Sequence, residues 1–417
     1  PQQVVAPPML RNSSGMAIGG GAGLGGAGGA AAGPSSGSHE RMPTMAPKLV
    51  ARSKGREAEA RHLANRVEAL LATGEPSLCF VSGEPGIGKS HLLRELRRCY
   101  GERDVRVVHA EAKRFDTEPL SVWLQLLRSL LAAFLSVPVE QVVSQGFGKA
   151  NSLIPPEFRG WAGHLTALLD GTSMEAISPR HLQAECEMIV KFVGGLIRSG
   201  GKPQLVLIDA AENLTSYAWQ VISGILLDSP SVAIIVAARD LATWCEDDKQ
   251  LLEFTRLMEW CASGRVGATH RLTPTLACSQ LDLLPLTPKA TRALLASALR
   301  CTEEVLEDET VRRAHARCGG NPGFLFEFCN AIFADAARRG EADRSINQAI
   351  ATALEQLPGT VKEIVLAELD RLPVPQQQLI KIAAAIGGPF EREMLIAIYP
   401  GPAAEVDDAL RAPAMQN

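Results

Sequence analysis

The first stretch with recognisable chemistry is GEPGIGKS at 83–90, which matches the pattern G-x-x-x-x-G-K-[ST] in full. An apolar run at 77–82 predicts a strand before it, and KSHLLRELRR predicts a helix after it. Glycines let backbone N–H groups turn inward around a phosphate, at a helix start that favours anions. Lys89 then supplies a charge for the terminal phosphates, and the Ser90 hydroxyl can bind Mg²⁺. The residues of this predicted phosphate-binding loop (P-loop) are Gly83, Glu84, Pro85, Gly86, Ile87, Gly88, Lys89, Ser90 and His91.

A carboxylate ligand for the metal is expected from QLVLIDAAENL at 204–214. Its apolar run predicts a strand with Asp209 near its C-terminal end, and ligands of such sheets lie at the carboxyl ends of the strands. We therefore expect Asp209 to bind Mg²⁺ together with Ser90. The alternative is an aspartate that only caps a helix.

The residues after Asp209 bear on hydrolysis. Enzymes that hydrolyse nucleoside triphosphates usually have a second acid there to orient the attacking water, but Ala210 and Ala211 follow here. Glu212 is the nearest acid and a candidate base; the alternative is an exposed turn residue. Arg239 ends VAIIVAAR and could reach the γ-phosphate, or could form a surface ion pair with a neighbouring carboxylate. The pattern predicts a site that binds ATP with Mg²⁺ and hydrolyses it slowly.

Elements that would position these residues alternate along the chain. Apolar runs predict strands at 77–82, 105–110, 204–210, 232–238 and 281–286. Helical patterns are predicted at 55–74, 119–135 and 181–197. Such alternation predicts an α/β fold, in which helices cover both faces of a parallel sheet in three layers.

Composition divides the chain further. A Gly-, Ala- and Ser-rich stretch predicts a disordered linker at 1–47. We then expect a P-loop domain at 48–286, a helical lid at 287–356 and a truncated winged-helix-like domain at 357–417. The chain starts with Pro1 and stops soon after an amphipathic pattern, which indicates a fragment of a longer protein.

The overall composition limits the classes of partner that the chain is expected to bind. A net charge of −4 gives no basic surface for nucleic acid or anionic lipid, so neither nucleic acid nor a membrane is expected as a partner. The nine cysteines are scattered without a C-x-x-C pair, and no signal peptide is visible. We expect reduced, mostly buried thiols and a cytoplasmic location.

Several motifs together resemble a known family. GREAEARHL (55–63), the P-loop, LVLIDAAENL (205–214), LLPLTPKATRALL (283–295) and GGNPGFLFEF (319–328) follow one another as in the STAND branch of AAA-like P-loop NTPases. Residues 366–400 resemble the segment that follows the NTPase in soluble adenylyl cyclase-like proteins. The resemblance implies that Asn321 and Pro322 lie near the adenine and link the nucleotide to the lid. A helix start with Pro322 at its first position is the alternative. The family's acidic pair is only half present, because Ala210 replaces its second member.

These observations predict an ATP-binding regulatory NTPase that acts as a slow switch in signal transduction, for an effector in the same longer polypeptide such as a nucleotide cyclase. One alternative is a competent ATPase that uses Glu212 as its base. The other is the NTPase module of a DNA-binding regulator. Residues 357–417 carry five Lys and Arg against eight Asp and Glu, which argues against reading DNA.

Overall fold

The computed structural model describes a set of segments that all lie in the unit Thr44–Asn417. They are residues 49, 52–114, 118–142, 156, 160, 162–170, 179–229, 231–239, 248–263, 277–339, 346–356, 369–370, 372–386 and 392–411. The expected linker at 1–47 lies outside the described residues.

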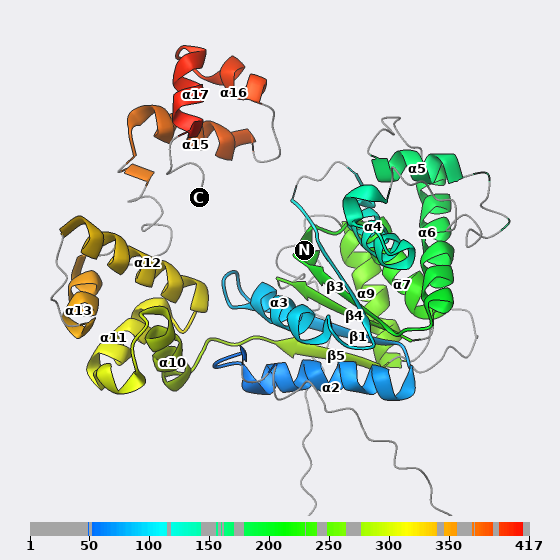
Figure 1. Ribbon diagram of the computed structural model, residues 1–417, viewed down its shortest axis with the longest axis horizontal. Coiled ribbons are helices and arrows are strands. Elements are labelled where there is room, and N and C mark those ends of the chain that lie inside the picture. The colour runs from blue at the N-terminus through cyan, green and yellow to red at the C-terminus, as the bar shows by residue number, and fades with distance from the viewer. Residues whose placement is uncertain are drawn as a thin grey trace, which may run out of the picture. The chain divides into compact units, whose positions relative to one another are not determined.

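Five strands form one parallel sheet in the order β2-β3-β4-β1-β5 (Figure 1). Their bounds are β1 Ser77–Ser82, β2 Arg106–Glu111, β3 Gln204–Asp209, β4 Val232–Ala238 and β5 Ala277–Asp282. The central strands β3 and β4 are buried along their whole length, as their unbroken apolar runs require in a sheet covered on both faces. The expected three-layer α/β architecture is confirmed.

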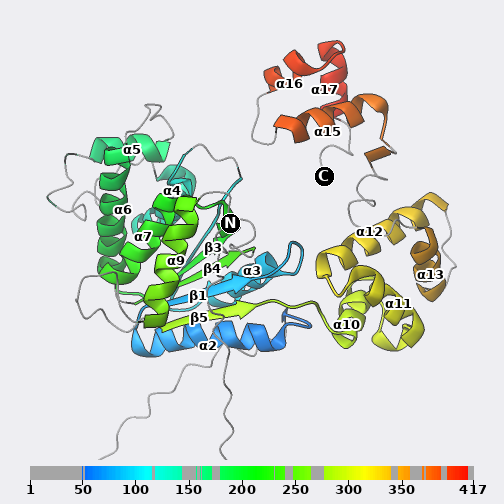
Figure 2. The same ribbon diagram turned by 180° about the vertical axis from the view of Figure 1, so that it is seen from behind.

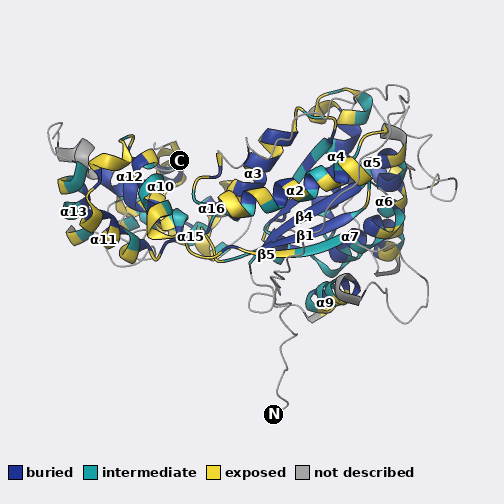
Figure 3. Ribbon diagram, turned by 90° about the horizontal axis from the view of Figure 1, so that it is seen from below, coloured by how far each residue is buried: buried dark blue, intermediate teal, exposed yellow. Residues whose placement is uncertain are grey.

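Helices cover both faces of this sheet. Helices α2 (Glu57–Thr73) and α3 (Lys89–Tyr100) pack on one face of the sheet and form an apolar core with it. The opposite face packs against α4, α5, α6, α7 and α9, whose bounds are Ser121–Leu135, Ala162–Asp170, Pro179–Gly200, Ser216–Asp228 and Asp248–Ser263. Figure 2 shows the same arrangement from behind, and in Figure 3 the strands β1 and β4 are buried between partly exposed helices. Single 3-10 turns lie at Val139–Gln141, Ala211–Asn213 and Glu303–Val305.

Side-chain alternation decides which face each strand residue serves. Along β3, Leu205 and Leu207 belong to the core shared with α2 and α3, while Val206 and Ile208 belong to the opposite core. Asp209 is the next residue on the α3 face. The strand therefore brings this carboxylate to the same side of the sheet as the helix that follows the P-loop.

The last strand lies earlier in the chain than the sequence predicts. The run LDLLPL at 281–286 was expected to be a strand, but β5 is Ala277–Asp282. Among the described strands β5 pairs with β1 alone, and it is partly exposed, so it does not need a continuous apolar sequence. Its apolar sequel is a connector in which Leu283 and Leu286 are buried while Leu284 is 68% exposed.

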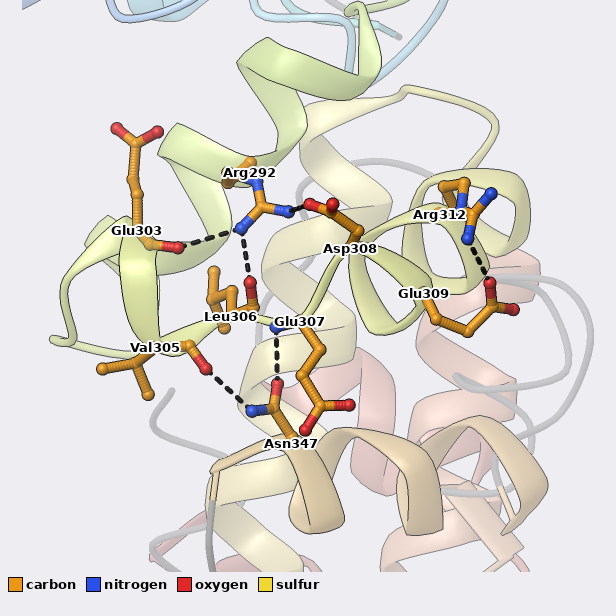
Figure 4. Close-up of polar contacts among 9 residues, drawn as sticks. All are labelled: Arg292, Glu303, Val305, Leu306, Glu307, Asp308, Glu309, Arg312 and Asn347. Carbon is orange, nitrogen blue, oxygen red and sulfur yellow. Dashed lines mark hydrogen bonds and ion pairs between the residues drawn. The ribbon is translucent and has the colours of Figure 1, made fainter.

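A separate helical core follows the sheet. It is built by α10 (Pro288–Ala298), α11 (Asp308–Cys318), α12 (Pro322–Arg339) and α13 (Ile346–Gln356). The Arg292 guanidinium donates to the carbonyls of Glu303 and Leu306 and pairs with Asp308 (Figure 4). The Asn347 amide donates to Val305 O at 2.7 Å and accepts from Glu307 N at 3.1 Å. These bonds tie the turn between α10 and α11 to α13.

The last described elements are α15 (Val374–Ile386), α16 (Arg392–Ile398) and α17 (Ala403–Arg411), which enclose a small core of their own. The described part of this segment contains helices only, so the winged-helix expectation stays a prediction. No helix in the described ranges has the length and apolar character needed to cross a membrane.

Close packing between α6 and α7 generates the first testable prediction. A Cβ on Gly224 of α7 would lie 2.6 Å from Val190 Cγ2 of α6. We expect Gly224→Ala to lower the free energy of unfolding by about 1–2 kcal/mol, because overpacking outweighs the gain in helix propensity. Urea unfolding followed by circular dichroism measures this change.

Gly163→Ala in α5 is the matched control, because a Cβ there has no atom within 4 Å. This substitution should leave the free energy of unfolding unchanged or raise it by up to about 1 kcal/mol. Equal effects at both positions would contradict the packing argument.

Candidate functional site

The P-loop connects β1 to α3 and depends on glycine at three positions. Gly83 has φ 152°, Gly86 has φ 77° and Gly88 has φ 109°, values that other residues rarely adopt. A Cβ on Gly86 would also lie 2.8 Å from Asn321 Oδ1. Gly88 precedes α3, and no side chain caps that helix N-terminus. The loop therefore leads into uncapped backbone N–H groups, which is the arrangement that attracts anions.

Lys89 is folded back onto its own loop. Its Nζ donates to Gly83 O at 2.6 Å and to Glu84 O at 3.0 Å, and the residue is only 9% exposed. Burial lowers the pKa of Lys89, and the carboxylates of Glu212 and Asp209 oppose that shift. The ammonium therefore lies where two acids and the loop carbonyls meet.

Asp209 and Ser90 are the two residues that the sequence predicts as oxygen donors for a metal. Asp209 ends β3, is 7% exposed, and accepts a hydrogen bond from Ala210 N through Oδ1 at 2.9 Å. Ser90 and His91 lie in the first turn of α3 and are exposed. The parallel strands place the β3 end and the P-loop at the same edge of the sheet, where burial lowers the pKa of Lys89 and the Asp209 carboxylate acts to raise it.

Glu212 and Arg239 are held by each other. Glu212 Oε1 lies 3.0 Å from Arg239 Nε, and Oε2 accepts from Arg239 N at 3.1 Å. The Glu212 side chain is 12% exposed, so it is not the exposed turn residue that the sequence left open. For Arg239 the ion pair with a neighbouring carboxylate is found, and Glu212 is the partner.

A left-handed turn brings Glu212 to this place. Ala210 has φ 53° and ψ 39°, and the 3-10 turn Ala211–Asn213 follows it. An L-residue with a Cβ is strained in this region, so surrounding bonds must hold it. Gln250 Nε2 donates to Glu212 O at 3.0 Å, and Asn213 Nδ2 donates to Ala112 O at 3.1 Å.

Asn321 lies against the P-loop backbone. Its Nδ2 donates to Pro85 O at 2.9 Å, and its Oδ1 accepts from Gly323 N at 2.9 Å. Gly323 N also lies 2.9 Å from Gly86 O. Pro322 is the first residue of α12, so the helix-start alternative is found as well. The start of α12 is thus bonded to two consecutive P-loop residues.

Arg56 is a site residue that motif analysis missed. It is 6% exposed, and its Nη2 donates to Ile87 O at 3.0 Å while Nη1 pairs with Glu59 at 3.1 Å. It therefore supports the P-loop from the side of α2. An arginine at the start of an amphipathic helix is usually solvated, so no local signal distinguished this one.

Residues 52–236 match the family model described as AAA ATPase domain. No curated protein matches the chain in sequence. Among solved structures, Drosophila ORC bound to DNA is 13% identical, with 90% of this chain and 85% of that chain covered and a TM-score of 0.41. The Walker-type ATPase of Pyrococcus abyssi is 16% identical, with 85% and 88% covered and a TM-score of 0.38. The RuvB Holliday junction branch migration motor of Thermotoga maritima is 15% identical, with 87% and 90% covered and a TM-score of 0.36.

The family match spans β1, the P-loop, α3 and Asp209. The parallel sheet and the full P-loop sequence agree with it. A family of this kind implies the use of ATP and Mg²⁺. The segment 52–236 is thus part of a P-loop NTPase domain of the AAA type.

Proposed function

We propose that the chain is an ATP-binding regulatory module that works as a slow nucleotide switch for an attached effector. The observation that carries the proposal is a contrast within one site. The P-loop and Asp209 retain the groups that binding needs, whereas the acid nearest to Asp209 in the following turn is engaged by Arg239.

The P-loop residues fit a triphosphate. Gly86 and Gly88 keep the loop backbone in conformations that let N–H groups converge, and α3 begins without a side-chain cap. In this proposal Lys89 leaves the loop carbonyls to contact the terminal phosphates. Ser90 and Asp209 would hold Mg²⁺, which neutralises phosphate charge when bound.

Slow turnover follows from how the acids are arranged. Ala210 stands where a water-orienting acid is usual, and alanine has no group to do this. Both Glu212 oxygens already have partners on Arg239, so orienting a water would require breaking that pair. Arg239 in turn would sense the γ-phosphate only by giving up Glu212. ATP would therefore persist long enough to act as a signal.

The bonds at the start of α12 suggest how the helical lid would respond to bound ATP. Asn321 and Gly323 bond to carbonyl groups of Pro85 and Gly86, within the loop proposed to bind phosphate. A change in this loop would reach the helical lid directly through these bonds. Such coupling fits a STAND-type role in signal transduction, with the nucleotide near Asn321 and Pro322.

The charge of the C-terminal segment favours a protein effector over nucleic acid. Residues 357–417 carry five basic against eight acidic residues, which would repel a phosphate backbone. The proposed effector is therefore a domain of the same longer polypeptide, such as a nucleotide cyclase. The proposed location is cytoplasmic.

Lys89→Ala should abolish detectable Mg-ATP binding while the fold persists, because the charge for the terminal phosphates is lost. Isothermal calorimetry on the folded variant measures the affinity. Lys202→Ala is the control: Lys202 pairs with Asp104 at 2.9 Å and is 51% exposed. Unchanged affinity in Lys89→Ala would remove the P-loop assignment.

Asn321→Ala should speed amide exchange in the P-loop and weaken Mg-ATP binding, because Pro85 O loses its donor. A hydrogen bond of this kind contributes about 0.5–1.5 kcal/mol to stability. Hydrogen exchange read by mass spectrometry locates the effect. Asn347→Ala removes a similar amide bridge within the lid and should leave P-loop exchange unchanged. If both variants behaved alike at the P-loop, the coupling through Asn321 would be wrong.

Single-turnover hydrolysis should be far slower than the usual range of roughly 1–10³ per second. Ala210→Asp should raise the rate, because it restores an acid after Asp209 at a φ that aspartate tolerates. Glu212→Gln should change the rate little. Fast wild-type turnover that collapses in Glu212→Gln would instead make this an ordinary ATPase with Glu212 as its base.

A further inference from the structure

Another carboxylate lies at the same edge of the sheet as Asp209. Glu111 is the last residue of β2, and the parallel register of β2 and β3 pairs Glu111 with Asp209. Adjacent strands are about 4.8 Å apart, so the two backbone positions are near neighbours. The backbone pairing continues past this point, since Ala112 N donates to Asp209 O at 3.0 Å.

Alternation places Glu111 on the α3 face of the sheet. Val108 and Ala110 belong to the core on the opposite face, and Val107 packs against the core that contains α3. His109 and Glu111 continue the series of Val107. Asp209 lies on this face as well, so both carboxylates share one side and one edge of the sheet.

The charges around His109 agree with this placement. Burial lowers the pKa of His109, and Asp209 and then Glu111 act in the opposite direction, while Arg97 and Arg94 of α3 add to the lowering. His109 therefore senses both acids and the α3 arginines at once.

Glu111 differs from Glu212 in being unengaged. Its residue is exposed, and within the described part of the chain its carboxylate has neither a hydrogen-bond nor an ion-pair partner. Only its main-chain oxygen is bonded, as the acceptor of a 3.4 Å hydrogen bond from Gln125 Nε2. By contrast, both oxygens of Glu212 are engaged by Arg239.

We propose that Glu111 is the catalytic carboxylate of the slow ATP hydrolysis at this site, a role that rests on the nucleotide switch proposed above. Glu111 accepts a proton from the attacking water as the water oxygen bonds to the γ-phosphorus. The bond from the γ-phosphorus to the β,γ-bridging oxygen breaks, and its electron pair leaves with ADP. The products are ADP and inorganic phosphate.

The position of Glu111 also accounts for a slow reaction. It projects from the strand beyond Asp209 as counted from β1, in the order β1, β4, β3, β2. An acid at position 210 would follow the metal carboxylate directly. Glu111 reaches the same water from the neighbouring strand, where its side chain is not fixed by any partner in the described residues.

The test is single-turnover hydrolysis of Mg-ATP, with affinity measured by calorimetry on the same proteins. Glu111→Gln should lower the rate at least about tenfold, within the range for loss of a general base, and leave Mg-ATP affinity unchanged. Glu111→Asp should retain an intermediate rate.

Glu102→Gln is the matched control, because Glu102 is an exposed glutamate in the turn leading into β2, at the opposite edge of the sheet. A wild-type rate in Glu111→Gln, or a wild type without any hydrolysis, would overturn the role of Glu111. Failure of the wild type to bind Mg-ATP would overturn the proposed function itself. Fast wild-type turnover that falls in Glu111→Gln would remove the slow switch and leave Glu111 as the base.

Discussion

The charge of Lys89 must be compensated where it lies, at the edge of the sheet and largely away from water. Two P-loop carbonyls, Asp209 and Glu212 supply that compensation from separate segments. They converge because all five strands are parallel, so that every strand delivers its carboxyl end to the same edge. The sheet, the glycines of the loop and the turn after β3 can each be understood as conditions for placing this one ammonium group.

The turn at Ala210 decides where the acid that follows Asp209 lies. A regular continuation after Asp209 would carry the next side chain along β3. The left-handed conformation of Ala210 instead ends the strand at once and delivers Glu212 to Arg239 at the end of β4. Left-handed backbone costs an L-residue about 1–2 kcal/mol, and the bonds from Gln250 and Asn213 offset that cost. The acid and the arginine thereby neutralise each other beside the P-loop.

Local patterns predicted what is local in the chain. Strand, glycine loop and helix adjoin in sequence around Lys89, so spacing alone located them, and the same holds for the strand that ends at Asp209. The Glu212–Arg239 pair joins residues from two strands, which spacing does not reveal. The sequence did not indicate Glu111, because its strand was expected to end at residue 110. Its place beside Asp209 is known only from the pairing of β2 with β3.

Helix α12 is bonded to the P-loop at one end only of its length, among the described residues. Its first turn is fixed to the peptide groups of Pro85 and Gly86, while the rest of the helix extends over eighteen residues from that point. A helix rises 1.5 Å per residue, so the far end of α12 lies about 27 Å from its first turn. In the proposed switch, α12 would carry a displacement of these loop peptides to residues of the helical core about 27 Å away.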